Sequence, residues 1–386
     1  MATPTVVPKT AYDLTVGVVV NMDEAIYLIS PDDAPFITGM GADGLSVISS
    51  QPVDEIQFSW LHDTLLLPRS AVTGGALTTG DTVVTVTSGD RSKFSTGDVL
   101  RINKTGNVDE IIRVTGYGTT ADTLLITKGY SGTSTNYASG AIIVGLGTAL
   151  PEGDDPESPR TVDRSEVSNV TQIFGPTSIA LSRTEQRVRK YGVSNEFAHQ
   201  VNGRMVENVV SREQAILYGR KFNSTTAKVR MMGGLMNYLQ TNIDTTTTTA
   251  TALNLQSSLQ TCYNQGGVPD RYAANPVGFA DLNDVGNTGI VRVTIDDPRR
   301  GRIRALMLDT EFGSLSLVRN RWMLPGNGIG FRRDNIIRRV LSPLTMERLA
   351  KTGDSDKVQI VCEEGLEVKG EKHQFAYTAL SYTGSV

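Results

Sequence analysis

The chain has 386 residues and a mass of 41.7 kDa, more than one hydrophobic core usually serves, so two or three folding units are expected. Hydrophobic residues make up 39% of the chain and charged residues 20%, a composition typical of folded globular proteins and not of disordered ones. The formal net charge of -4 excludes the global basic excess that many nucleic-acid-binding and membrane-surface proteins carry.

Cysteine usage and hydropathy indicate a cytoplasmic place of synthesis. Cys262 and Cys362 are far apart in sequence and form no CxxC pair, which fits a reducing compartment and excludes a disulfide scaffold. The start of the chain lacks the basic region of a secretory signal, and no segment approaches the roughly 20 apolar residues of a membrane span. We therefore expect no secretion and no membrane anchor.

Prolines and glycines interrupt residues 1–50, which excludes a long helix or a central strand and predicts an extended arm. An apolar run between Val53 and Trp60 then predicts a short strand.

Residues 71–149 are rich in Gly, Thr, Val and Ile, and their apolar positions alternate with polar ones. The clearest runs are 82–87, 99–103, 108–116 and 123–127. Short strands at regular spacing are typical of a small barrel or sandwich, so we expect an inserted β module here. The acidic, proline-rich segment LPEGDDPESPR that follows predicts a loop.

A helical period runs from Ser194, a suitable N-cap, to Phe222, and predicts a spine-like helix of roughly 40 Å. Its apolar face is predicted to comprise Phe197, Val201, Met205 and Val209. Its polar face is predicted to comprise Glu196, Arg204, Glu207, Arg212 and Glu213.

The remainder of the chain mixes loops, one short helix and strands. The Thr-rich tract at 241–253 suits a loop, and Leu255, Leu259 and Cys262 mark an amphipathic helix that Gly266 can end. From Val358 onward, two alternating runs around a KGEK turn predict a terminal β hairpin or meander.

Catalytic and cofactor motifs are absent from the sequence. It contains no HExxH, GxSxG or Walker-type pattern, and His62, His199 and His373 are scattered, so we predict no catalytic residue, no cofactor and no metal. The acidic residues Glu152, Asp154 and Asp155 could be interpreted as a cation site or a carboxylate pair. The prolines around them, and the missing calcium-loop spacing, favour a solvated or subunit-contacting loop.

One local charge feature is unusual, a concentration of arginines in the last third of the chain. It comprises Arg292, Arg299, Arg300, Arg302, Arg304, Arg319, Arg321, Arg332, Arg333, Arg338 and Arg339. These guanidinium groups could bind nucleic-acid phosphates or pair with carboxylates across subunit contacts. Because the whole chain is acidic, we favour subunit contacts and single out Arg299, Arg300, Arg332 and Arg333.

Six segments in order resemble the major capsid proteins of tailed bacteriophages, which share the fold named for the Hong Kong ninety-seven phage. The segments are SPDDAPFITGMG, FSWLHDTL, LPEGDD, NVTQIF, RMMGGLMNYLQTNI and LAKTGDSDKVQIVCEEGLEVKGEKH. The resemblance implies an α+β fold with a small all-β domain inserted in the E-loop. It also implies a division into an N-terminal arm (1–50), an E-loop (51–70 and 150–180), the β module (71–149), a P-domain with the spine helix (181–245 and 346–386) and an A-domain (246–345).

The function that this resemblance implies is that of a non-enzymatic subunit, which forms hexamers and pentamers in an icosahedral shell around a double-stranded DNA genome. Assembly in the cytoplasm of a host bacterium, a separate scaffolding protein and a portal are expected with it. A decoration protein is a further candidate partner, and packaged DNA is expected to be contacted only non-specifically. The main alternative is a β-rich phage tail or adhesion protein, and a glycosidase with paired carboxylates is a more distant one.

Overall fold

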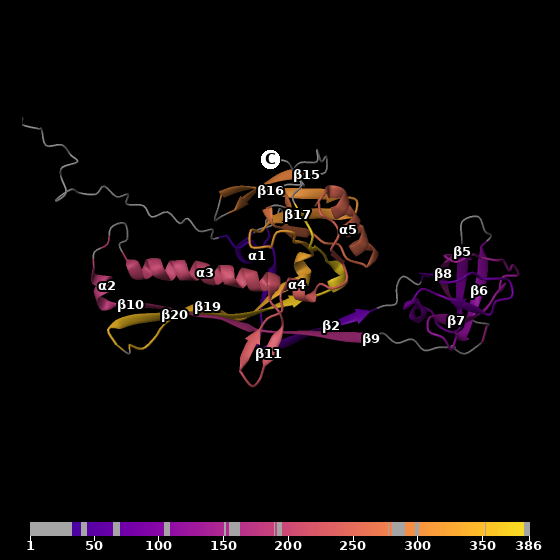
Figure 1. Cartoon of the computed structure of the whole chain (residues 1–386), viewed down its shortest axis with the longest axis horizontal. Helices are drawn as coiled ribbons and strands as arrows, with labels where there is room; N and C mark the ends of the chain where they lie inside the picture. Colours follow the sequence, from indigo (N-terminus) through magenta and orange to yellow (C-terminus); the bar gives the residue numbers. More distant parts are fainter. Residues whose placement is uncertain are drawn as a thin grey trace, which may run out of the picture. The chain divides into compact units, whose positions relative to one another are not determined.

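The computed structural model describes residues 33–39, 45–64, 70–103, 109–149, 152–153, 163–188, 190, 195–276, 278–279, 290–297, 301–351 and 353–381 (Figure 1). The chain divides into two compact units, one of Met1–Trp60 with Val167–Val386 and the other of Leu61–Glu166. Helices and strands both contribute to the first unit, so the predicted α+β class is confirmed.

A four-stranded sheet with the order β1-β19-β20-β10 forms the base of the first unit. Its strands are β1 (Ser49–Pro52), β19 (Ile336–Arg348), β20 (Ser355–Val368) and β10 (Gln172–Ser182). The pairs β19–β20 and β20–β10 are antiparallel, whereas the short β1 runs parallel to β19. Helix α3 (Glu196–Tyr218) lies along β10 (Figure 1).

A second sheet in the same unit has seven strands in the order β13-β21-β18-β14-β17-β16-β15. They are β13 (Ile243–Asp244), β21 (Phe375–Tyr377), β18 (Gly328–Phe331), β14 (Arg271–Ala274), β17 (Gly313–Arg319), β16 (Gly301–Thr310) and β15 (Ile290–Asp297). Helix α5 (Ala252–Asn264) contributes Leu255, Leu259 and Cys262 to the core beside it. Stacking of Tyr272 on Phe375, with ring centroids 6.1 Å apart, fills the centre of this core.

Shorter elements complete the first unit. They are α1 (Pro35–Thr38), α2 (Arg183–Arg187), α4 (Leu235–Tyr238) and the hairpin of β11 (Phe222–Ser224) and β12 (Val229–Met231). The two-stranded pair of β2 (Gln57–Thr64) and β9 (Asp163–Val170) contains the chain positions at which the two units divide. Cys262 and Cys362 are both buried, and each is a free thiol.

Helix α3 is the predicted spine. Ser194, the predicted N-cap, lies outside the described residues, and the Asn195 side chain caps the helix by accepting a hydrogen bond from the backbone N–H of Ala198. Val201 packs against Ile179 and Ile360 of the sheet, with Phe197 and Met205 at the margin of that cluster. Three of the four residues of the predicted apolar face, Phe197, Val201 and Met205, therefore meet the sheet.

The predicted polar face of α3 is wrong at two positions, because Arg212 and Glu213 are 6% and 0% exposed. Arg212 lies three residues after Val209 and four before Ile216, so the helical period that places those residues near the core places Arg212 there as well. Both charged side chains find buried partners, which makes their burial possible.

The second unit contains a six-stranded sheet with the order β3-β8-β5-β6-β7-β4. Its strands are β3 (Ser70–Val72), β8 (Ile142–Thr148), β5 (Asp98–Asn103), β6 (Glu110–Tyr117), β7 (Thr123–Thr127) and β4 (Val83–Thr85). A bridge between Thr73 and Val86 joins the two edge strands and closes the sheet into a barrel. The barrel has its own core, which includes Phe94, Leu100, Ile112 and Leu124.

The predicted terminal hairpin or meander is wrong, because the two runs that were expected to be neighbours lie in different sheets. Strand β20 pairs with β19 and β10, whereas β21 pairs with β18 and β13. Between them Gly370 adopts a left-handed conformation (φ +57°) and a 3₁₀ turn follows at Glu371–His373, so the chain is redirected toward the second sheet. Each run thereby meets a larger apolar surface than a two-stranded hairpin offers.

A proline in α3 tests whether the helix is the spine of the unit. Met205→Pro removes a backbone donor and clashes with the preceding turn, so the free energy of unfolding should fall by about 3 kcal/mol or more. Arg204→Ala, at the adjacent exposed residue that pairs with Glu207, should change it by less than about 1 kcal/mol. Denaturant unfolding followed by circular dichroism measures both variants, and equal losses would contradict the face assignment.

Candidate functional site

A buried ionic cluster joins α3 to the four-stranded sheet. The guanidinium of Arg212 donates two hydrogen bonds to the carboxylate of Glu364 on β20, Nε to Oε1 at 2.8 Å and Nη2 to Oε2 at 2.6 Å. Arg338 of β19 approaches the same carboxylate at 3.4 Å. Glu364 is 1% exposed, whereas the Arg338 side chain is 17% exposed, so two cations share one anion that is itself shielded from water.

The next residue of α3, Glu213, joins the helix to α1 and to the end of β17. Its Oε1 accepts hydrogen bonds from the backbone N–H of Phe36 at 2.9 Å and from Nδ2 of Asn320 at 2.6 Å. Its Oε2 has no hydrogen-bond partner. Burial raises the pKa of Glu213 to about 7, since the donors of Phe36, Asn320 and Ile37 only partly offset the loss of water around the carboxylate.

The two buried charged residues of α3, Arg212 and Glu213, therefore fix the helix to four other elements. The short α1 is held further because Trp322 donates its Nε1–H to the carbonyl of Asp33 at 2.6 Å, and Arg321 pairs with the Asp33 carboxylate at 2.7 Å. Stacking of Phe36 on Phe331 at 5.5 Å adds an apolar contact. The cluster orders the unit, and it presents no group to a substrate because its polar atoms are enclosed.

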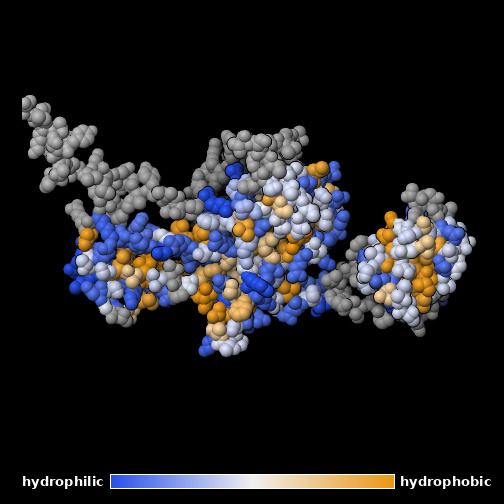
Figure 2. Space-filling model, viewed as in Figure 1, coloured by the Kyte–Doolittle hydropathy of each residue, from blue (hydrophilic) through white to orange (hydrophobic). Residues whose placement is uncertain are grey.

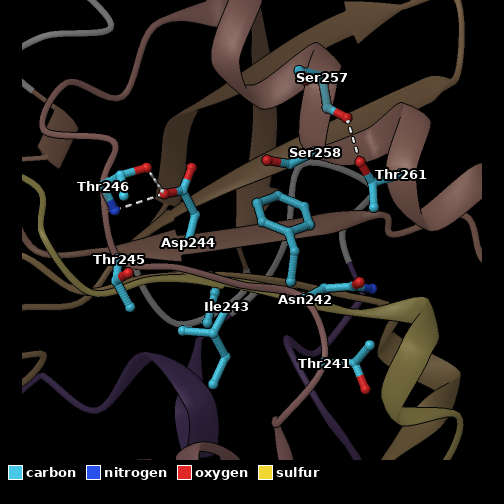
Figure 3. Close-up of a pocket in the computed structure, with 11 residues that line it drawn as sticks. Thr241, Asn242, Ile243, Asp244, Thr245, Thr246, Ser257, Ser258 and Thr261 are labelled. Atoms are coloured by element: carbon cyan, nitrogen blue, oxygen red, sulfur yellow. Dashed lines mark hydrogen bonds between the residues drawn. The ribbon is translucent and has the colours of Figure 1, made fainter. Parts of the chain in front are cut away.

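One depression of about 350 Å³ lies between the Thr-rich tract, α5 and β21 (Figure 3). Hydroxyl groups line it, among them Thr246, Ser257, Ser258 and Thr261. Its carboxylate, Asp244, accepts hydrogen bonds from the backbone N–H and hydroxyl groups of Thr246 and Thr247. Burial raises the pKa of Asp244, but the Thr247 and Thr246 hydrogen bonds outweigh it and lower the pKa to about 2. This carboxylate stabilises its own turn.

The part of the chain that the structure describes contains no group of three or more His, Cys, Asp or Glu side chains arranged to hold a metal ion. In the same described ranges, no helix is both long and apolar enough to cross a membrane.

The predicted contact residues are only partly placed. Arg299, Arg300, Asp154 and Asp155 lie outside the residues whose side chains are described. Glu152 is exposed in a turn.

Arg332 and Arg333 are both described and differ in their surroundings. The Arg332 side chain is 49% exposed and reaches Asp334 only at 4.0 Å. Arg333 is held within its own chain, since its Nε donates to the carbonyl of Ser46 at 3.0 Å and its backbone N–H donates to Asp270 at 2.8 Å. Arg332 is thus the freer of the two to contact another molecule.

The residues that sequence reasoning missed are Arg212, Glu213 and Glu364. The helical period offered a signal for Arg212, because residues 201, 205, 208, 212 and 216 form one stripe along α3. No comparable signal exists for Glu364, whose partners are 152 and 26 residues away in sequence.

Buried charges thus fix helix α3 along the four-stranded sheet, and a seven-stranded sheet completes the unit. A family model described as SU10 major capsid protein matches residues 7–381, which is nearly the whole chain. The chain therefore belongs to the SU10 major capsid protein family. It is a non-enzymatic major capsid protein, whose copies form the shell of the virion.

Similar folds occur among solved structures, all at low sequence identity. The capsid of the Myoviridae phage XM1 is 10% identical with a TM-score of 0.48, and the match covers 95% of this chain and 100% of that one. The Microbacterium phage Oxtober96 chain is 10% identical with a TM-score of 0.46, covering 93% and 92%. An encapsulin complex of Synechococcus elongatus is 10% identical with a TM-score of 0.44, covering 58% and 80%. No curated protein matched the sequence significantly.

Family membership confirms the resemblance and the fold class that the sequence predicted. It also decides against the alternatives of a tail or adhesion protein and of a glycosidase.

The raised pKa of Glu213 predicts a specific pH dependence of stability. Because the folded state holds this proton up to about pH 7 while an unfolded glutamate releases it near 4.5, the stabilising contribution is complete below about pH 4.5 and is lost as pH rises through 7. The loss should be on the order of 3 kcal/mol. Glu213→Gln, which mimics the neutral acid, should remove this slope.

Urea unfolding of the soluble subunit between pH 4.5 and 8 measures the slope. Glu207→Gln, at an exposed position of the same helix, serves as the control and should behave like the wild type. Identical pH profiles for the wild type and Glu213→Gln would show that Glu213 does not carry the effect.

Proposed function

We propose that identical copies of this chain assemble as hexamers and pentamers into an icosahedral shell around double-stranded DNA. The observation that carries the proposal is the family match over residues 7–381, since it spans both compact units. A separate scaffolding protein and a portal would complete the assembly, with a decoration protein as a further candidate partner. Assembly would take place in the cytoplasm of the host bacterium.

Surfaces that remain exposed to solvent in a single copy of the chain support this proposal. The β2–β9 pair is only two strands wide, and such a ribbon is marginal in water by itself. Leu61 on β2 is 63% exposed, and Ile56 just before it is 47% exposed. Many copies with repeated contacts would bury these surfaces and close a shell.

The proposed assignment of domains follows the regions inferred from the sequence. Residues 51–70 and 150–180 would form the E-loop, with 71–149 as a module inserted in it. Residues 181–245 and 346–386 would form the P-domain around α3, and 246–345 the A-domain. Residues 1–50 would act as an arm, most of which lies outside the described residues.

Arginine side chains and the acidic loop are proposed to serve subunit contacts. Arg299, Arg300 and Arg332 would pair with carboxylates of neighbouring copies, and Glu152, Asp154 and Asp155 would supply such carboxylates. Arg333, given its internal hydrogen bonds, would contribute by fixing the turn that presents Arg332. Packaged DNA would be contacted only non-specifically, because a chain with net charge -4 gains little from a polyanion.

Assembly can be tested directly. Co-expressed with a scaffolding protein, the chain should form closed shells of uniform size, because each copy covers surfaces that its neighbours leave exposed. Negative-stain electron microscopy and sedimentation velocity measure the outcome. Protein that sediments only as a monomer under every such condition would contradict the proposal.

Replacing the arginines proposed for subunit contacts distinguishes these contacts from DNA contacts. Arg299→Gln, Arg300→Gln and Arg332→Gln together should leave the subunit folded and reduce shell yield at least about tenfold, since paired guanidiniums lose charge and geometry. Arg333→Gln alone should lower thermal stability instead. Normal shell yield from the triple variant, with weaker DNA binding of reduced salt dependence, would assign these arginines to the genome.

A further inference from the structure

Directly after α3 the chain forms the β11–β12 hairpin, which projects from the unit. A backbone hydrogen bond closes the base of the hairpin, which we call the neck. The neck is formed by Gly219 and Gly234, whose backbone N–H···O distance is 2.7 Å. A Cβ on Gly219 would lie 2.5 Å from the carbonyl oxygens of Ala215 and Met232, so only glycine allows this approach. Figure 1 shows the hairpin projecting away from the four-stranded sheet.

Side chains hold the hairpin in a fixed position on the sheet. Arg230 of β12 pairs with Glu363 of β20 at 2.6 Å and donates from Nε to the carbonyl of Thr171 at 3.3 Å. Gln172 accepts from the backbone N–H of Met232 at 3.1 Å. Lys221 donates to the hydroxyl of Ser168 at 2.7 Å. These contacts use one face of the hairpin and pre-organise the other.

Strand register places the apolar side chains on that other face. Phe222 pairs with Met231, and Ser224 with Val229, while the anchoring Arg230 pairs with Asn223. Because side chains alternate along a strand, Phe222, Val229 and Met231 project opposite to Arg230. They are 50%, 49% and 42% exposed, and none belongs to a core cluster. In Figure 2 hydrophobic residues gather at the base of the hairpin.

The hairpin is also basic. Residues 219–234 contain no acidic residue and four basic ones, Arg220, Lys221, Lys228 and Arg230. Without these four of its 37 lysines and arginines, the rest of the chain has 33 basic against 41 acidic residues, a net charge of -8. The remaining surface of another copy is therefore complementary in charge to the hairpin.

We infer that the exposed face of the hairpin, formed by Phe222, Val229 and Met231, is a contact surface for a second copy of this chain. The inference rests on the proposed shell-forming function and names one of its contacts. An aromatic and a methionine side chain on a rigid support are typical of the residues that contribute most to binding at interfaces. The anchoring of the opposite face means that little conformational entropy is lost on contact.

The first test removes the apolar face. Phe222→Ser combined with Met231→Ser should leave the thermal unfolding of the isolated subunit near that of the wild type and reduce shell yield at least about tenfold. Asn223→Ser, on the opposite face of the same strand, is the matched control and should assemble normally. Unchanged assembly of the double variant would overturn the inference.

The second test identifies the molecule that contacts the exposed face of the hairpin. Met231→Cys labelled with a benzophenone maleimide can be photo-crosslinked in assembled shells, and the native Cys262 and Cys362 are buried and so do not compete for the label. Mass spectrometry should find crosslinks to a second copy of this chain. Crosslinks only to a scaffolding or decoration protein, or none, would overturn the inference while leaving the shell function intact. Failure of the wild type to form any shell would instead refute the proposed function.

Discussion

Two guanidinium groups and one carboxylate, enclosed together under helix α3, set the geometry on which the rest of the larger unit depends. Glu364 accepts two hydrogen bonds from Arg212 and lies 3.4 Å from Arg338, so a helix and two strands meet at a single anion. Removing Glu364 would leave two guanidinium groups without a counter-charge in a largely buried site, which costs several kcal/mol. The cluster therefore allows one position of α3 on the sheet.

The fixed position of α3 also determines where the elements bonded to its carboxyl-terminal half lie. Glu213 forms hydrogen bonds with α1 and with Asn320 at the end of β17. Through the helix, the start of the described chain is therefore connected to the second sheet. Gly219 follows the helix directly and fixes the point at which the β11–β12 hairpin begins, because only glycine allows the close backbone contacts there. For a subunit of a closed shell this matters because a small error in the angle of one contact is repeated in every copy.

Stability and assembly draw on different parts of the chain. The cores of both units are apolar and closed, and the barrel of β3 to β8 is complete by itself. The apolar surfaces proposed for assembly instead lie on narrow elements, the β2–β9 ribbon and the β11–β12 hairpin. Substitutions at exposed positions of these elements are therefore expected to weaken a shell and leave the subunit folded.

The sequence by itself determined features that depend on local periodicity. Alternation in 99–103 and 123–127 placed β5 and β7, the helical period placed α3, and six ordered segments identified the family. Only the tertiary structure decided that Arg212 and Glu213 are buried, that β20 and β21 join different sheets, and that Phe222 and Met231 face outward opposite Arg230. The physical reason is that burial of a charge depends on partners far away in sequence, such as Glu364 and Asn320, and no local pattern encodes which distant strand will supply them.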